Sequence, residues 1–168
     1  MFGLTSLGVI HTAISLVAVI AAVIAFARSG LIDPATAAGK TYVIATILTC
    51  VTGFGIFAHG GFGKPHVLGI LTLLVLGVAW LARSDRVFGR SSAAVEVVSF
   101  SLTFFFHMIP GITETTTRLP LGSPLFASPE APELKAITGG VFLLFLIGAT
   151  FQVRRLKRDG HRAFAARA

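Results

Sequence analysis

The chain has few charged residues and almost no cysteine. Only 12% of its 168 residues are charged, and 7 acidic residues stand against 14 Lys and Arg. The single cysteine, Cys50, excludes an intramolecular disulfide, and its place in an apolar run predicts a small buried packing residue. The sequence also lacks a Gly-x-Ser-x-Gly nucleophile elbow, a phosphate-binding loop and a His-Glu-x-x-His motif. No residue is therefore assigned a catalytic role, and enzymatic activity is neither predicted nor excluded.

Long apolar runs dominate the sequence, and hydrophobic residues make up 54% of it. A helix of about 20 apolar residues crosses the roughly 30 Å hydrocarbon core of a bilayer. A β-barrel is not expected, since its strands would be about ten residues long with alternating polarity. We therefore predict an all-α integral membrane protein, a bundle of five transmembrane helices. The predicted spans are Leu4–Ala27, Thr41–Ala58, His66–Leu81, Ala93–Ile112 and Ile137–Gln152.

The first apolar run resembles a secretory signal only in the cleavage-like spacing of Ala25 and Ala27. No basic residue precedes this run, it is too long for a signal, and its first positive charge, Arg28, comes after it. This pattern predicts a retained first span with the N-terminus outside.

Basic residues fall mainly on one predicted side of the membrane. The outer segments hold only Lys64, Arg118 and Lys135. The inner segments hold the other eleven: Arg28, Lys40, Arg83, Arg86, Arg90, Arg154, Arg155, Lys157, Arg158, Arg162 and Arg167. An excess of Lys and Arg marks the cytoplasmic side, so the C-terminus is predicted to lie inside.

The formal charge of +7 is thus interpreted as a topology determinant. Nucleic-acid binding is not expected, because the basic residues are spread over loops and no nucleic-acid-binding motif is present. Residues 1–153 are predicted to form the bundle, and residues 154–168 a basic cytoplasmic tail. The tail is expected to lie against anionic lipid headgroups, where each basic residue contributes about 1 kcal/mol.

The largest outer connection is predicted over residues 113–133. It contains four prolines, which argue against a long helix. The apolar residues Leu119, Leu121, Leu125 and Phe126 favour a lid that docks over the outer end of the bundle. A disordered connection is the alternative.

Four of the five histidines are predicted to lie near the outer face. His11 is about seven residues inside the first span, His107 about five residues before the end of the fourth, and His59 and His66 flank one outer turn. The fifth, His161, is in the basic tail. An imidazole within the hydrocarbon layer must face the bundle interior and find a partner. A hydrogen bond to Ser, Thr or a carbonyl of a neighbouring helix is the ordinary solution.

Haem b is the cofactor that this arrangement fits best. A membrane haem needs axial imidazoles from separate helices, and small residues where the macrocycle approaches the backbone. Gly8, Gly69 and Gly111 each lie three or four residues from a histidine, on the same face of a regular helix. The function predicted is electron transfer near the quinone pool, with a quinone or respiratory-chain membrane proteins as partners. The candidate haem ligands are His11, His59, His66 and His107.

Two other interpretations stay open. A copper or zinc site would need three or four ligands within about 2.0–2.1 Å of the ion, although no compact His-x-x-x-His motif is present. Its candidate ligands are His11, His59, His66, His107 and Glu114. The other interpretation is a non-catalytic structural or assembly subunit of a larger membrane complex, with hydrogen-bonded histidines.

Several weakly polar residues of the second span complete the pattern. Thr46, Thr49 and Thr52 form a stripe that is predicted to pack against a neighbouring helix. Tyr42, near the inner boundary, is interpreted as an interfacial anchor. Glu96, in the first turn of the fourth span, is predicted to interact with the helix dipole, with an inner proton relay as the alternative.

One stretch carries a resemblance to a known family. Its residues are Gly39, Lys40, Tyr42, Gly60, Gly61, Phe62, Gly63, His66, Leu68, Leu71, Thr72 and Leu73. The stretch resembles a family of uncharacterised predicted bacterial membrane proteins, over residues 39–83. The resemblance implies a multi-pass protein of the bacterial inner (cytoplasmic) membrane, with His66 as a characteristic residue. The general plan also resembles small b-type membrane cytochromes, an analogy of architecture alone.

Overall fold

The computed structural model describes residues 5–57, 61–84 and 87–165, with side chains up to residue 159. Regular structure in this part of the chain is helical. The elements are α1 (Ser6–Ser29), α2 (Ala37–Gly53), α3 (Lys64–Arg83), the 3₁₀ turn η1 (Gly89–Ser91), α4 (Ser92–Arg118) and α5 (Pro132–Ala165). The predicted all-α class is confirmed.

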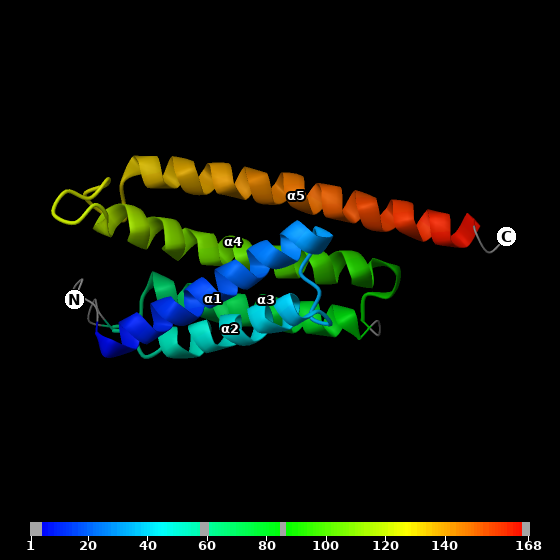
Figure 1. The fold of residues 1–168 in the computed structure, drawn as a ribbon, viewed down its shortest axis with the longest axis horizontal. Helices are drawn as coiled ribbons and strands as arrows, with labels where there is room; N and C mark the ends of the chain where they lie inside the picture. The colour runs from blue at the N-terminus through cyan, green and yellow to red at the C-terminus, as the bar shows by residue number, and fades with distance from the viewer. Residues whose placement is uncertain (1–4, 58–60, 85–86, 166–168) are drawn as a thin grey trace.

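The helices run back and forth along the long axis of the molecule (Figure 1). Each helix packs against the next one in the chain, and α1 makes a smaller contact with α4. The last helix, α5, packs mainly against α4 and lies at the edge of the bundle (Figure 1).

Within the described residues, four helical segments are long and apolar enough to cross a membrane: α1, α3, α4 together with η1, and α5 as far as Asp159. Helix α2 is shorter, with 17 residues. At 1.5 Å per residue it is about 26 Å long, and about 17 residues is the lower limit for a spanning helix.

The fourth helix is longer than predicted, because α4 continues past Ile112 to Arg118. Its last turns are stabilised by Thr116, whose hydroxyl donates to the carbonyl of Ile112 at 2.8 Å. An ion pair between Glu114 and Arg118 links side chains four residues apart on the same helix. The connection to α5 is therefore residues 119–131, shorter than the predicted 113–133.

This connection folds as a compact turn on the end of α4. The amide of Leu125 donates to the carbonyl of Leu119 at 3.1 Å, and the amide of Phe126 to that of Thr116 at 3.1 Å. Leu119 is 44% exposed, and Leu121 and Leu125 are 67% exposed. The turn projects past the ends of α4 and α5 (Figure 1), with the leucines of the predicted lid exposed.

The fifth helix also exceeds its predicted bounds. It begins at Pro132 rather than Ile137 and continues beyond Gln152 to Ala165. The basic segment after the apolar run is therefore a rigid continuation of α5, with Arg155 and Asp159 paired at 3.7 Å.

Small side chains fill much of the interior. Ala18 and Ala22 of α1 and Ala79 of α3 are fully buried, beside Phe100 of α4 and Ile32 of the α1–α2 turn, each 1% exposed. Small residues let helix backbones approach closely, which is the usual basis of helix packing in membranes.

Arg83 links three elements at one end of the bundle. Its guanidinium lies 3.3 Å from Asp33 in the α1–α2 turn and 2.6 Å from Glu96 near the start of α4. The Glu96 carboxylate is thus paired with a cation from α3, a contact that the sequence did not predict.

Helix α5 caps the C-terminal end of α1. Gln152 donates to the carbonyl of Gly30 at 2.8 Å, and Arg155 to the carbonyl of Ser29 at 2.8 Å. Ser101 of α4 donates to the Gln152 carbonyl oxygen at 2.9 Å, so one side chain joins three helices. The last carbonyls of a helix have no partner within it, and α5 supplies partners here.

Gly39 is the position where the fold is least tolerant of a larger residue. A Cβ there would lie 2.0 Å from the carbonyl oxygen of Asp33. Gly39→Ala is expected to cost about 1–3 kcal/mol of unfolding free energy, as overpacking does, measured by SDS titration of the protein in detergent micelles. The control is Gly77→Ala, since nothing lies within 4 Å of a Cβ at Gly77, and alanine favours a helix. Equal losses in the two variants would contradict this prediction.

Candidate functional site

Three of the four candidate histidines lie in the described residues, on three different helices. His11 is in the first turns of α1, His66 is at the start of α3, and His107 is on α4, eleven residues before Arg118. His107 is therefore further from its helix end than predicted, because α4 is longer. His59 lies outside the described residues.

His107 is buried and bonded to α2. Its Nε2 atom lies 3.0 Å from the hydroxyl of Thr46, and the side chain is 8% exposed. The ring of Tyr42, also on α2, meets the imidazole edge-on with centroids 6.0 Å apart. The imidazole thus has the interhelical hydrogen bond that a polar group in an apolar interior needs.

Tyr42 forms a second polar link between α2 and α4. Its hydroxyl lies 2.7 Å from the Thr103 hydroxyl, which donates its own proton to the carbonyl of Phe100 at 2.8 Å. Tyr42 is therefore the donor to Thr103. Because Tyr42 is fully buried, its prediction as an interfacial anchor was wrong; its ring packs in the core.

His11 is bonded to α2 nearer the other end of that helix. Its Nδ1 atom lies 3.1 Å from the Thr52 hydroxyl, which donates its proton to the carbonyl of Leu48 at 2.8 Å. Thr52 therefore accepts from Nδ1–H, which leaves the lone pair of a neutral imidazole on Nε2. A Cβ at Gly53 would lie 3.2 Å from the His11 ring, so this glycine of α2 makes room for it.

His66 is used locally, as a cap of its own helix. Its Nδ1 atom accepts the amide hydrogen of Gly63 at 3.2 Å, which satisfies one of the free amides at the start of α3. The ring stacks between Phe57 and Phe62, with centroid distances of 5.1 and 5.3 Å. Its Nε2 atom is buried and has no hydrogen-bond partner among the described residues. Because Nδ1 accepts, the proton of a neutral ring is on Nε2.

The candidate carboxylate ligand, Glu114, is paired with Arg118 at the exposed end of α4. Among the described residues, no three His, Cys, Asp or Glu side chains come together as a metal ion would require. The candidate copper or zinc ligands that the structure describes therefore do not lie together. The remaining candidate, His59, lies outside the described residues.

The histidine partners are the threonines of α2, which the sequence marked only as a packing stripe. Thr46 binds His107 and Thr52 binds His11, while Thr49 accepts from Ser15 of α1 at 3.4 Å. Their spacing of three residues puts them along adjoining parts of one helix surface. That spacing was the signal in the sequence that the three threonines share one helix face, but it does not show which helix they face.

The Thr46–His107 bond is expected to stabilise the fold measurably. Thr46→Val keeps the side-chain volume and leaves the imidazole nitrogen unpaired, and His107→Leu removes the other partner. A double-mutant cycle, followed by SDS unfolding in detergent, should give a coupling of about 0.6–1.7 kcal/mol, the range for interhelical bonds in membranes.

The control for this cycle pairs His107→Leu with Thr150→Val. Thr150 is exposed on α5 and donates to its own helix, at the carbonyl of Leu146. The two effects should add without coupling, as they do for distant sites. A coupling of zero between Thr46→Val and His107→Leu would contradict a stabilising bond.

Comparison of the chain with protein-family models, curated proteins and solved structures gives no match. The family resemblance of residues 39–83 therefore stays a prediction, and function is argued from the geometry of the site.

Proposed function

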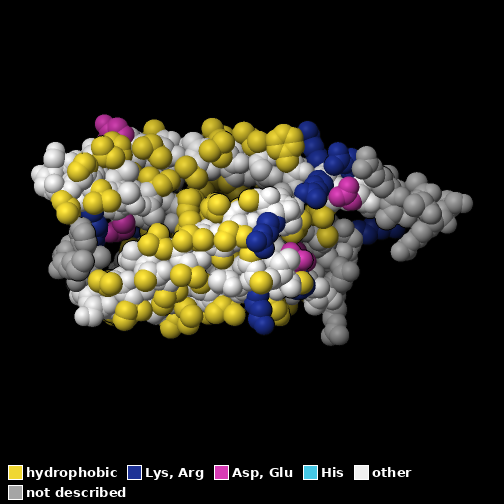
Figure 2. Space-filling model, viewed as in Figure 1, with side chains coloured by type: hydrophobic (Ala, Val, Ile, Leu, Met, Phe, Trp, Pro, Cys, Tyr) yellow, Lys and Arg dark blue, Asp and Glu magenta, His cyan; other side chains and the backbone are white. Residues whose placement is uncertain are grey.

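We propose that the chain is a multi-pass integral membrane protein in which all five helices cross the bilayer. Large apolar side chains point outward on α1, α2, α3 and α5: Leu16 is 56% exposed, Val51 56%, Leu74 61% and Leu143 60%. Figure 2 shows hydrophobic side chains along most of one face, up to the Lys and Arg side chains near one end. An apolar surface of this extent is unusual for a soluble monomer and is suited to lipid. Helix α2 is long enough to cross if the bilayer thins slightly around it.

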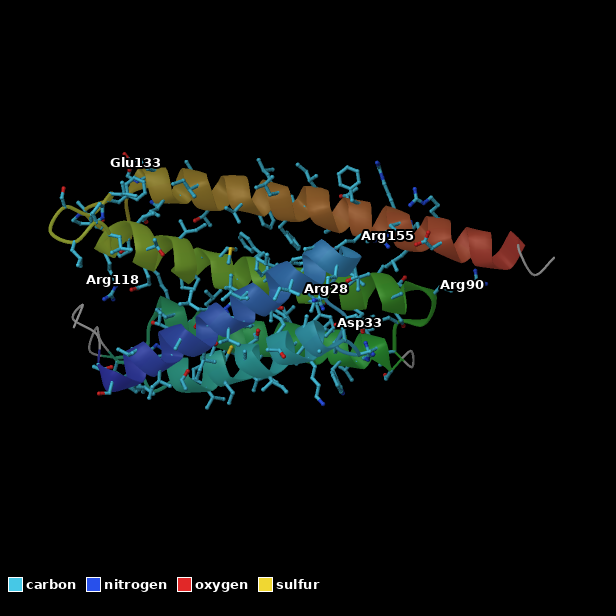
Figure 3. The ribbon with its side chains drawn as sticks, viewed as in Figure 1. Arg28, Asp33, Arg90, Arg118, Glu133 and Arg155 are labelled. Carbon is cyan, nitrogen blue, oxygen red and sulfur yellow. The ribbon has the colours of Figure 1, made fainter. Side chains whose placement is uncertain are left out.

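The distribution of charge supports an outer N-terminus and an inner C-terminus. Arg28, Arg90 and Arg155 lie toward one end of the molecule, and Arg118 and Glu133 lie toward the other (Figure 3). The sequence assigns eleven of the 14 basic residues, including Arg28, Arg90 and Arg155, to the segments predicted inside. In a bacterial inner membrane the end with these three arginines would face the cytoplasm.

Cysteine labelling tests this orientation. Lys64→Cys and Arg90→Cys are introduced separately into a Cys50→Ala background, at exposed positions near opposite ends of the bundle. A membrane-impermeant maleimide should label the first variant in intact spheroplasts and the second only after permeabilisation. The reverse pattern would contradict the proposed orientation, and labelling of both in intact spheroplasts would contradict membrane crossing between the two positions.

Within the membrane, the geometry best supports a non-catalytic role, as a structural or assembly component of a membrane complex. The observation that carries this proposal is the buried bond between His107 and Thr46. The His11–Thr52 bond repeats the same arrangement on α1. Both deep histidines use a ring nitrogen to join α2 to another helix, which accounts for their presence without a cofactor.

Haem b binding for electron transfer is the second candidate, and His11 is the residue that favours it. Its Nε2 carries the lone pair that an iron ligand needs, because the ring proton is on Nδ1, which donates to Thr52. The other histidines fit less well, since an axial bond from His107 would have to replace Thr46, and His66 holds its proton on Nε2. A quinone and respiratory-chain proteins belong to this candidate as partners.

Visible spectra of the purified protein separate the candidates. The protein is expressed with added haem precursor, purified in detergent, and scanned oxidised and dithionite-reduced, with metal analysis in parallel. The structural proposal expects a colourless, metal-free protein with a cooperative unfolding transition. A sharp reduced α-band with stoichiometric iron would contradict it, and His11→Ala and His107→Ala would then identify the ligands. Stoichiometric copper or zinc without such a band would establish the metal-binding alternative instead.

A further inference from the structure

Helix α5 is longer than a bilayer requires, and the part of the helix beyond the spanning portion is strongly basic. Its 34 residues make a helix about 51 Å long, whereas about 20 residues span the hydrocarbon core. Counted from Pro132, the spanning portion ends near Phe151. The next turn begins with Arg154 and Arg155, which therefore lie at the depth of the lipid headgroups.

One face of α5 combines an aromatic ring with three guanidinium groups. Phe151, Arg154, Arg155 and Arg158 line a shallow groove on the surface of the structure. Their spacing of three, four and seven residues places them on a single helix face. Asp159 pairs with Arg155 at 3.7 Å and with Arg158 at 3.9 Å, so one carboxylate partly offsets three cations.

The same face continues as an exposed apolar track toward the middle of the membrane. Leu144 is 66% exposed, Ile147 53% and Phe151 66%. Gly148 lies among them, and nothing is within 4 Å of where its Cβ would be. The glycine leaves a flat segment beside two apolar side chains, a surface on which an acyl chain can lie.

Arg155 holds the cationic end of this face in place. Its guanidinium donates to the carbonyl of Ser29 at the end of α1, which orders a side chain that would otherwise be mobile. A guanidinium held in this way is suited to a phosphate, whose oxygens match its fork of N–H donors.

We propose that this face of α5 binds an anionic phospholipid. The arginines Arg154, Arg155 and Arg158 hold the headgroup phosphate, and the track from Phe151 to Leu144 holds an acyl chain. The positive charge of the arginines favours an anionic ligand. The adjoining apolar track favours a lipid over a soluble phosphate, because it can contact an acyl chain. This inference rests on the proposed membrane insertion of α5.

The test is a lipid titration of the whole protein in detergent. The midpoint of SDS unfolding is recorded for the natural protein and for the double variant Arg154→Gln/Arg158→Gln. Each protein is titrated separately with dioleoyl phosphatidylglycerol, dioleoyl phosphatidylcholine and inorganic phosphate. The double variant leaves Arg155 in its structural contact. Phosphatidylglycerol should stabilise the natural protein at lower concentration than phosphatidylcholine does. The double variant should need about 25-fold more of it, since each arginine near a lipid surface contributes about fivefold.

The matched control is Arg90→Gln/Lys157→Gln, which removes two positive charges from the same end of the molecule. Lys157 is on α5 but does not line the groove, and Arg90 is on η1. The control should keep the natural preference for phosphatidylglycerol. An equal loss in both double variants would indicate general electrostatic attraction and overturn the site, as would stabilisation by inorganic phosphate at the concentrations at which the lipid acts.

Gly148→Leu tests the acyl track separately. It fills an open position on the lipid-facing side, so the unfolding midpoint without lipid should change little. The variant should weaken the response to dioleoyl phosphatidylglycerol while leaving that to a short-chain analogue unchanged; no change in either would overturn the track. Carbonate extraction of membranes tests insertion independently, since release of the natural protein would contradict the membrane proposal itself.

Discussion

Polar side chains inside an apolar helix bundle must find partners within it, and the packing of α2 meets this constraint. Thr46 bonds to His107 and Tyr42 to Thr103, so two buried links join α2 to α4. Thr52 bonds to His11 and joins α2 to α1. An unpaired polar group in such an interior costs free energy that few other contacts could offset. The rotation of α1 and α4 about their axes is therefore tied to α2.

The same constraint accounts for how the histidines are used. His11 and His107 lie on different helices, and each turns a ring nitrogen toward α2 rather than toward a shared centre. His66 departs from this pattern, since it caps α3 and stacks between two phenylalanine rings, with Nε2 unpartnered in the part of the chain that the structure describes. The interior is thus organised by pairs of side chains that join neighbouring helices.

The two ends of the molecule differ in how their helices are held together. At the basic end, Arg83 joins the α1–α2 turn to α4, and Arg155 caps α1 from α5. The Arg155 contact, together with the bond from Gln152 to Gly30, holds α5, which otherwise packs mainly on α4, against the end of α1. At the other end, α4 extends to Arg118 and carries a compact turn with exposed leucines. The exposed apolar surface of α5 follows from this edge position.

The sequence by itself determined the helical class and the approximate place of each helix, because apolar run length and flanking charge are local properties. It did not determine the end of α4 at Arg118 or of α5 at Ala165, since these extensions are polar and depend on hydrogen bonds, ion pairs and turn contacts. Only the tertiary structure decided that Tyr42 is buried and that Thr46 is the partner of His107, 61 residues away. Such pairs depend on how each helix is rotated about its axis, and that rotation is set by contacts between helices distant in the chain.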